Sequence, residues 1–131
     1  MFEQEYIKVL SAPRAIQVGE IEFNDVEVAD DDESIKRGLM NRDRIPLDAC
    51  MLFKFDDDAV RSFWMKNCRF PIVVLFLDKD MKVVSWHRMK VEDGPEYRSY
   101  SSHVPARYAI EFMDDGFDYG IHVGTKAIMI A

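Results

Sequence analysis

The sequence is poor in cysteine and has no long apolar run, and each shortage excludes a class of protein. Its 131 residues contain two cysteines, Cys50 and Cys68, which are too far apart for a C-x-x-C pair. Buried reduced thiols are the favoured interpretation, with a disulfide between them as the alternative. No apolar stretch approaches the roughly 18 to 20 residues of a membrane-spanning helix, so no membrane span is expected.

Basic residues are also in short supply. The chain has 17 lysines and arginines against 24 aspartates and glutamates, which gives a formal net charge of -7. Because domains that bind nucleic acid concentrate Lys and Arg on one face, we expect no nucleic acid partner. The N-terminal stretch MFEQEYIKVL places Glu3, Glu5 and Lys8 among its apolar residues and lacks the apolar core of a secretory signal. We therefore expect a soluble, cytoplasmic protein.

What is present suits one folded domain over residues 1–131. Hydrophobic residues make up 48% of the chain and charged residues 31%, with no break in composition. Alternating or β-branched apolar residues predict strands at residues 21–28, 51–55, 72–78, 106–112 and 125–130. A hairpin over residues 77–91 is predicted to turn at Lys79 and Asp80.

A short helix is predicted in DDDESIKRGLMNR, residues 30–42. An aspartate can cap its first turn, acidic residues follow, and basic residues lie toward its end. Gly38 is unfavourable inside a helix, so it indicates close packing or an early helix end. A turn or a single helical turn is predicted at 56–62, a long loop at 92–105 and a further helical turn at 114–124. The fold class is therefore α+β, with a curled, mostly antiparallel sheet or partly open barrel and one or two short helices.

Four motifs in a fixed order carry a family resemblance. They are RGLMNR at 37–42, MLFKF at 51–55, FWMKN at 63–67 and PIVVLFLDKD at 71–80. Together they resemble the domain of unknown function 192 family, over about residues 18–130. The resemblance implies a small α+β fold and assigns no activity. It marks as a structural signature the residues Gly38, Leu39, Met40, Met51, Phe53, Phe63, Met65 and Asp78.

The chain departs from the family pattern at several positions. Glycine, threonine, aspartate, glycine and aspartate are the family's usual residues at the positions of Cys50, Cys68, Val73, Met81 and Thr125. The loop at 92–105 also lacks the cysteines that many members carry there. These differences weaken any chemistry that depends on the missing groups.

Polar side chains embedded in the apolar motifs form the main candidate ligand site. An arginine offers a planar fork for a carboxylate or phosphate, a lysine a point charge, and an asparagine both a donor and an acceptor. Trp64 and Met65 would form the apolar wall of such a pocket. The candidate ligand-binding residues are Arg37, Arg42, Trp64, Lys66 and Asn67.

A purely structural interpretation competes with this site. Arg37 and Lys66 would then pair with acids such as Asp78 or Glu111, or bind carbonyl groups at the helix end. If FWMKN is a strand, Phe63 and Met65 face the core while Trp64 and Lys66 share the other face. The lysine ammonium would then lie against the indole.

No catalytic residue, metal site or cofactor is predicted. The three histidines His87, His103 and His122 are scattered and have no metal-ligand spacing. Ser99, Ser101, Ser102 and His103 lie in the predicted loop without a G-x-S-x-G elbow.

Three functional hypotheses follow. The leading one is a binding or assembly module that presents a cationic and aromatic surface to a small ligand or a protein partner. The first alternative is an enzyme whose small anionic substrate is held by Arg37, Arg42 and Lys66, with Asp78 or Glu111 as acid-base candidates. The second is a structural or accessory component of a larger particle, for instance a virion.

Overall fold

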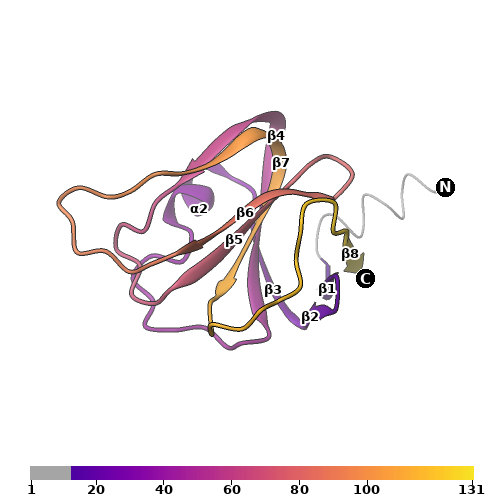
Figure 1. Cartoon of the computed structure of the whole chain (residues 1–131), viewed down its shortest axis with the longest axis horizontal. Helices are drawn as coiled ribbons and strands as arrows, with labels where there is room; N and C mark the ends of the chain where they lie inside the picture. Colours follow the sequence, from indigo (N-terminus) through magenta and orange to yellow (C-terminus); the bar gives the residue numbers. More distant parts are fainter. Residues whose placement is uncertain (1–12) are drawn as a thin grey trace.

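Residues 13–131, the part of the chain that this computed structural model describes, contain eight β-strands and one short α-helix (Figure 1). The prediction that the N-terminal stretch is no secretory signal falls on residues 1–12 and lies outside the described part. In chain order the elements are β1 (Ala15–Val18), β2 (Ile21–Phe23), β3 (Asp25–Ala29), α2 (Asp32–Arg37), β4 (Ala49–Phe63), β5 (Ile72–Leu77), β6 (Val83–Met89), β7 (Tyr100–Met113) and β8 (Ala127–Ile130).

The strands form two sheets. One has three strands in the order β2-β1-β8, and the other has five in the order β3-β4-β7-β5-β6. Strands β3 and β4 pair in parallel, and every other pair within the two sheets is antiparallel. The predicted α+β class with mostly antiparallel sheets is confirmed. Within residues 13–131 the sheets do not close into a barrel, and the expected curl of the sheet stays a prediction.

Both faces of the five-stranded sheet are buried. Leu52, Leu75 and Ile110 face one side, where they pack with residues of the three-stranded sheet. Their sequence neighbours, such as Phe53 and Val74, face the other side, which α2 and the segments around it cover. Figure 1 shows α2 and the small sheet on opposite sides of the large one. This burial on both faces explains why β5 is apolar at every position.

The helix is bounded by local interactions that the sequence predicts. The Asp31 carboxylate accepts a hydrogen bond of 2.7 Å from the Ser34 backbone N–H, and the Ser34 hydroxyl accepts one of 3.3 Å from the Asp31 N–H. This reciprocal pair is a capping box. Gly38 follows the last helical residue with a φ of 49°, and its N–H donates to the Ser34 carbonyl. Gly38 is therefore where the helix ends.

The second predicted helical turn, at 114–124, is wrong. Within residues 13–131 the only helix is α2. Aspartate side chains in this segment accept hydrogen bonds from backbone N–H groups two residues further on. Asp114 accepts from the Gly116 N–H, and Asp118 accepts from the Gly120 N–H. Such bonds compete with helix formation. No helix among the described residues has the length and apolar character needed to span a membrane.

The predicted turn at 56–62 is also wrong, because β4 continues through it to Phe63. Strand β7 begins at Tyr100, so the predicted loop at 92–105 is shorter than expected. The pairing of the two strands shifts register twice. At one of these shifts the Ser102 hydroxyl accepts a hydrogen bond of 2.8 Å from the Arg61 backbone N–H. In a regular strand pair a backbone carbonyl oxygen would accept it. The long β4–β7 ribbon brings Arg61 and Phe63 toward α2.

Candidate functional site

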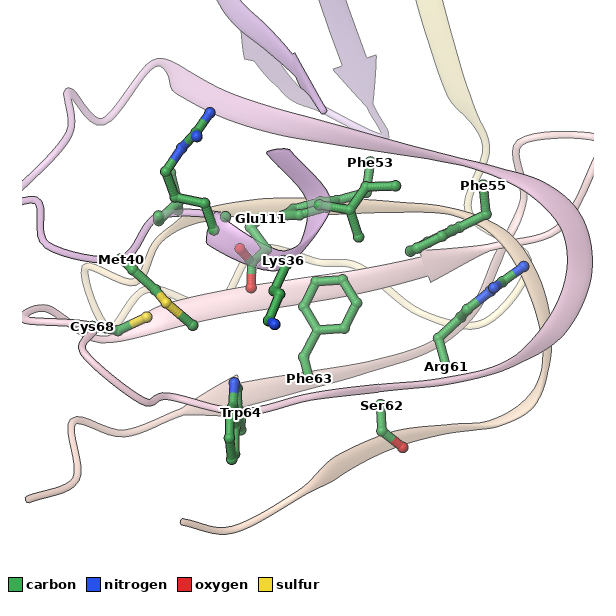
Figure 2. Close-up of a pocket in the computed structure, with 14 residues that line it drawn as sticks. Lys36, Met40, Phe53, Phe55, Arg61, Ser62, Phe63, Trp64, Cys68 and Glu111 are labelled. Atoms are coloured by element: carbon green, nitrogen blue, oxygen red, sulfur yellow. The ribbon is translucent and has the colours of Figure 1, made fainter. Parts of the chain in front are cut away.

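A pocket of about 270 Å³ lies between α2 and the β4–β7 ribbon. Its walls are aromatic, from Phe53, Phe55, Phe63 and Trp64, and the Glu111 carboxyl lies among them (Figure 2). We call this space the aromatic pocket. Three cationic side chains also line it, those of Lys36, Arg37 and Arg61.

A second hollow of about 410 Å³ adjoins the first. It is lined by Glu33, Asn67 and three cations, Lys36, Arg37 and Lys66, and we call it the cationic cleft. The two spaces adjoin because both are lined by Lys36, Arg37, Met40 and Trp64. One continuous surface thus carries cationic side chains along its whole length, and most of its aromatic faces lie in the aromatic pocket.

The structure brings together four of the five predicted ligand-binding residues. Arg37, Trp64, Lys66 and Asn67 all line the cationic cleft. Arg42 does not line it, and the expected convergence of this arginine with the others is not found.

Arg42 instead forms a bidentate ion pair with Glu27. Its guanidinium nitrogens lie 2.8 and 2.6 Å from the two oxygens of the Glu27 carboxylate. The hydrogen bonds from Arg42 lower the pKa of Glu27. A separate small hollow of about 70 Å³ lies beside this pair. The two side chains satisfy each other, so Arg42 is left out of the candidate site.

The FWMKN motif is a strand end followed by a turn, so the predicted strand through it is wrong beyond Phe63. Asn67 has a positive φ of 60°, which a strand cannot contain. The Lys66 ammonium nevertheless lies 5.3 Å from the centroid of the Trp64 ring, as the structural interpretation predicted. Met65 is fully buried, and Phe63 packs edge-to-face on Phe53 at 4.9 Å. The predicted core role is therefore found for Met65, whereas Phe63 is partly buried and also lines the aromatic pocket.

The cations of the cleft are not neutralised by the acids that the structural interpretation named. Arg37 pairs with Glu33 at 3.3 Å, and their side chains are 56% and 87% exposed. Such surface pairs contribute little to stability. Within residues 13–131, neither Arg37 nor Lys66 forms an ion pair with Asp78 or Glu111.

Asp78 has a structural role at the β5–β6 hairpin. One of its carboxylate oxygens accepts hydrogen bonds from the backbone N–H groups of Asp80 and Lys82, at 2.9 and 3.0 Å. It therefore shapes the turn predicted at Lys79 and Asp80 and does not line the pocket. Of the two acid-base candidates, only Glu111 lies in the site.

Glu111 is placed by strand alternation in β7. Its neighbours in the register are Met51 of β4 and Val74 of β5, which both belong to the apolar core on the helix side. The residue is 5% exposed, and this burial raises the pKa of its carboxyl to about 8. A carboxyl at this position is therefore largely protonated at neutral pH.

Two of the cations that line the aromatic pocket, Lys36 and Arg61, are not predicted from the sequence. Lys36 precedes Arg37 in α2, and adjacent helical residues point in different directions, so helix geometry gives no signal that Lys36 joins the site. The sequence predicts a turn around Arg61, whereas in the structure this residue belongs to β4 and its guanidinium carbon lies 4.1 Å from the centroid of the Phe55 ring. Cys68 also lines the pocket, but burial and then the nearby Glu111 raise the pKa of its thiol to about 11. A thiol with this pKa is a poor nucleophile at neutral pH.

Comparison with known proteins identifies a family and a shared fold. The model of the domain of unknown function 192 family, described as "Uncharacterized ACR, COG1430", matches residues 15–129. A crystal structure from Sinorhizobium meliloti 1021, of a protein suggested to be a transcription regulator, matches with a TM-score of 0.77 and 24% identity over 88% of this chain and 92% of that chain. A protein of unknown function from Novosphingobium aromaticivorans DSM 12444 matches with a TM-score of 0.76 and 20% identity over 87% and 83%. No curated protein gives a significant match. At these identities the structural likeness shows the fold alone.

Proposed function

The chain belongs to the domain of unknown function 192 family, which is uncharacterised, and we propose that it is a binding module for a small organic anion. The anion's charged group occupies the cationic cleft, and its apolar body extends into the aromatic pocket. The observation that carries this proposal is the convergence of Lys36, Arg37 and Lys66 on one hollow of about 410 Å³.

The charge of the cleft favours an anion. Its three cations face one lining acid, Glu33, which pairs with Arg37 in an exposed geometry. Because that pair is weak, Arg37 can turn its guanidinium to a ligand carboxylate or phosphate at little cost in stability. Lys66 and Lys36 then add two further positive charges at the same place.

The aromatic lining favours an anion with an apolar body. Trp64 is 49% exposed and contributes to both spaces. Ligand sites are typically apolar hollows of about 300 to 1,000 Å³ with a few polar groups that orient the ligand. An inorganic anion would leave the aromatic faces unused, whereas an aromatic or branched acid would cover them.

The enzyme alternative has one supporting observation, which is the buried carboxyl of Glu111 beside the anion site. A substrate would have to react through that single acid, because Asp78 lies elsewhere and the Cys68 thiol stays protonated. A binding module requires only the groups already described, so it is the preferred proposal.

Fluorescence of Trp64 tests the proposal directly. In a Trp86→Phe background Trp64 is the only tryptophan of the chain, and titration with benzoate and phenyl phosphate should change its emission saturably. Lys66→Ala and Lys36→Ala should each weaken binding about tenfold, as expected for loss of a charged hydrogen bond. Lys79→Ala, which removes an exposed lysine at the β5–β6 turn, is the matched control and should bind as the parent does.

Two results would contradict the proposal. One is the absence of a saturable change up to about 10 mM of either anion, a concentration above the range of weak specific binding. The other is equal affinity in the parent, Lys66→Ala and Lys36→Ala proteins, which would show that these cations do not contact the ligand.

A further inference from the structure

The aromatic pocket contains a buried carboxyl that the fold itself does not use. Glu111 is 5% exposed, and none of the ion pairs among residues 13–131 includes its carboxyl. Figure 2 shows the carboxyl pointing into the pocket. Because the carboxyl lines the pocket, a ligand group that enters this space can reach it.

The surroundings of Glu111 favour its neutral form. The charged or titratable groups that line the pocket with it are Lys36 and Arg37 from α2, Arg61 from β4 and Cys68 from the segment before β5. None of them forms an ion pair with it. Burial among apolar groups raises the pKa of Glu111 to about 8. Below that pH the group is a carboxylic acid, which can donate its proton in a hydrogen bond.

The chemistry of the pocket indicates which ligand group would meet this acid. A ligand cation is disfavoured because Lys36, Arg37 and Arg61 line the same space. A ligand carboxylate is better placed at the exposed cations of the cleft than beside a buried acid. A neutral acceptor oxygen, as in a ketone, an amide or an ether, can accept the acid's hydrogen bond without placing a charge beside a buried carboxyl.

Building on the proposed function, we propose that Glu111 is a ligand-binding residue whose carboxyl donates a hydrogen bond to an acceptor oxygen at the apolar end of the bound anion. The ligand class is therefore a small acid with an aromatic or branched body, an anionic group at one end and a carbonyl or ether oxygen at the other. The anionic group lies in the cationic cleft and the oxygen faces Glu111.

Two probes of nearly identical shape isolate this hydrogen bond. 4-Acetylbenzoate carries an acceptor oxygen where 4-isopropylbenzoate carries a methyl group, and both are anions throughout the pH range used. At about pH 6.5 the wild type should bind the acetyl compound about five- to tenfold more tightly, as expected for one hydrogen bond to a buried partner. At about pH 9.5 Glu111 is ionised, and the ratio of the two affinities should fall to one or below. The ratio cancels the effect of partial lysine deprotonation, which acts on both probes.

Two variants separate hydrogen bonding from packing. Glu111→Gln keeps a donor that does not titrate, so its preference for the acetyl probe should persist at both pH values. Glu111→Leu removes the donor and should bind the two probes equally at both. The wild-type ratio needs no variant, so a variant that fails to fold leaves the test intact.

The outcomes distinguish the two proposals. Equal binding of both probes by the wild type at both pH values overturns the role of Glu111 and leaves the anion-binding proposal standing. If neither probe binds, the proposed function fails and the role of Glu111 fails with it. A preference for the acetyl probe that persists in Glu111→Leu shows that another group donates the bond, which also overturns the inference.

Discussion

The backbone N–H of Asn41 donates a hydrogen bond of 2.8 Å to the carbonyl oxygen of Asn67. Both residues have a positive φ, of 66° and 60°. Asparagine adopts this conformation more readily than other residues with a side chain. The bond joins the segment that follows α2 to the turn that follows Trp64. It therefore holds together two walls of the cationic cleft.

Substitutions at Asn67 separate its backbone role from its side-chain role. Asn67→Gly should unfold at nearly the same urea concentration as the wild type, because glycine adopts a positive φ without strain. Asn67→Val should lose about 1 to 2 kcal/mol of unfolding free energy, because a β-branched residue is strained there. If the amide contacts the anion, Asn67→Gly should bind benzoate a few-fold more weakly. Equal destabilisation by Gly and Val would contradict this assignment.

Gly38→Ala should destabilise the protein through backbone strain. The residue has φ 49° and ψ -129°, a combination that is essentially confined to glycine. A Cβ atom there would lie 3.5 Å from Phe53 and 3.7 Å from Glu111, which are ordinary contacts. The expected loss of unfolding free energy, about 1 to 3 kcal/mol, would therefore come from strained backbone dihedral angles and not from a steric clash.

The control for Gly38 is Gly120→Ala, at an exposed glycine with φ 65° and open space around the added atom. We expect a smaller loss there. Urea unfolding with an unchanged m-value measures both changes. A Gly38→Ala protein as stable as the wild type would show that the strain is absent.

The buried carboxyl of Glu111 predicts a pH-dependent stability. Its pKa rises from an ordinary 4.5 to about 8 in the folded state. Between these values the unfolded chain has released the proton that the folded chain still holds, so unfolding is favoured as the pH rises. The contribution of Glu111 to the unfolding free energy is complete below about pH 4.5. It decreases by a few kcal/mol as the pH rises toward 8.

Comparing the wild type with Glu111→Gln tests this dependence. The glutamine does not titrate, so the difference in unfolding free energy between the two proteins should shift in favour of the variant from about pH 5 to about pH 8.5. Above that range the difference should be constant. A difference that does not change with pH would mean that Glu111 is ionised in the folded protein at neutral pH.

The two cysteines should react slowly in the folded protein. Burial raises the pKa of the Cys50 thiol to about 12 and that of Cys68 to about 11. Little thiolate is then present at about pH 8, and thiolate is the species that attacks a disulfide reagent. A chromogenic disulfide should modify both cysteines within seconds only after denaturation. Rapid modification of one thiol in the native protein would contradict the burial of that residue.

Much of the local structure was accessible from sequence, because short-range interactions determine it. The capping aspartate and Gly38 bound the helix, and the apolar run of β5 indicates burial on both faces. The errors at 56–62 and 114–124 have different physical causes. A run of aspartates indicates a turn at 56–62, whereas pairing with β7 extends β4 through that segment. At 114–124, aspartate side chains bind nearby backbone N–H groups in place of a helical turn.

The candidate site was predictable only in part. Arg37, Trp64, Lys66 and Asn67 stand out as polar or exposed groups within apolar motifs, and the structure gathers all four. Arg42 has the same sequence signal, yet Glu27 binds it. A sequence pattern does not show which acid lies within reach of a long side chain.

By itself the sequence determined the family, through four motifs in a fixed order. It also determined the α+β class, the start and end of α2 and the burial of β5, because these depend on local patterns of residues. Tertiary structure alone decided that Glu111 would face the aromatic pocket. Its position follows from pairing with Met51 and Val74, which lie 60 and 37 residues away in the chain. Strand register over such separations depends on the packing of the whole sheet, and a shift of one residue would have turned the carboxyl to the opposite face.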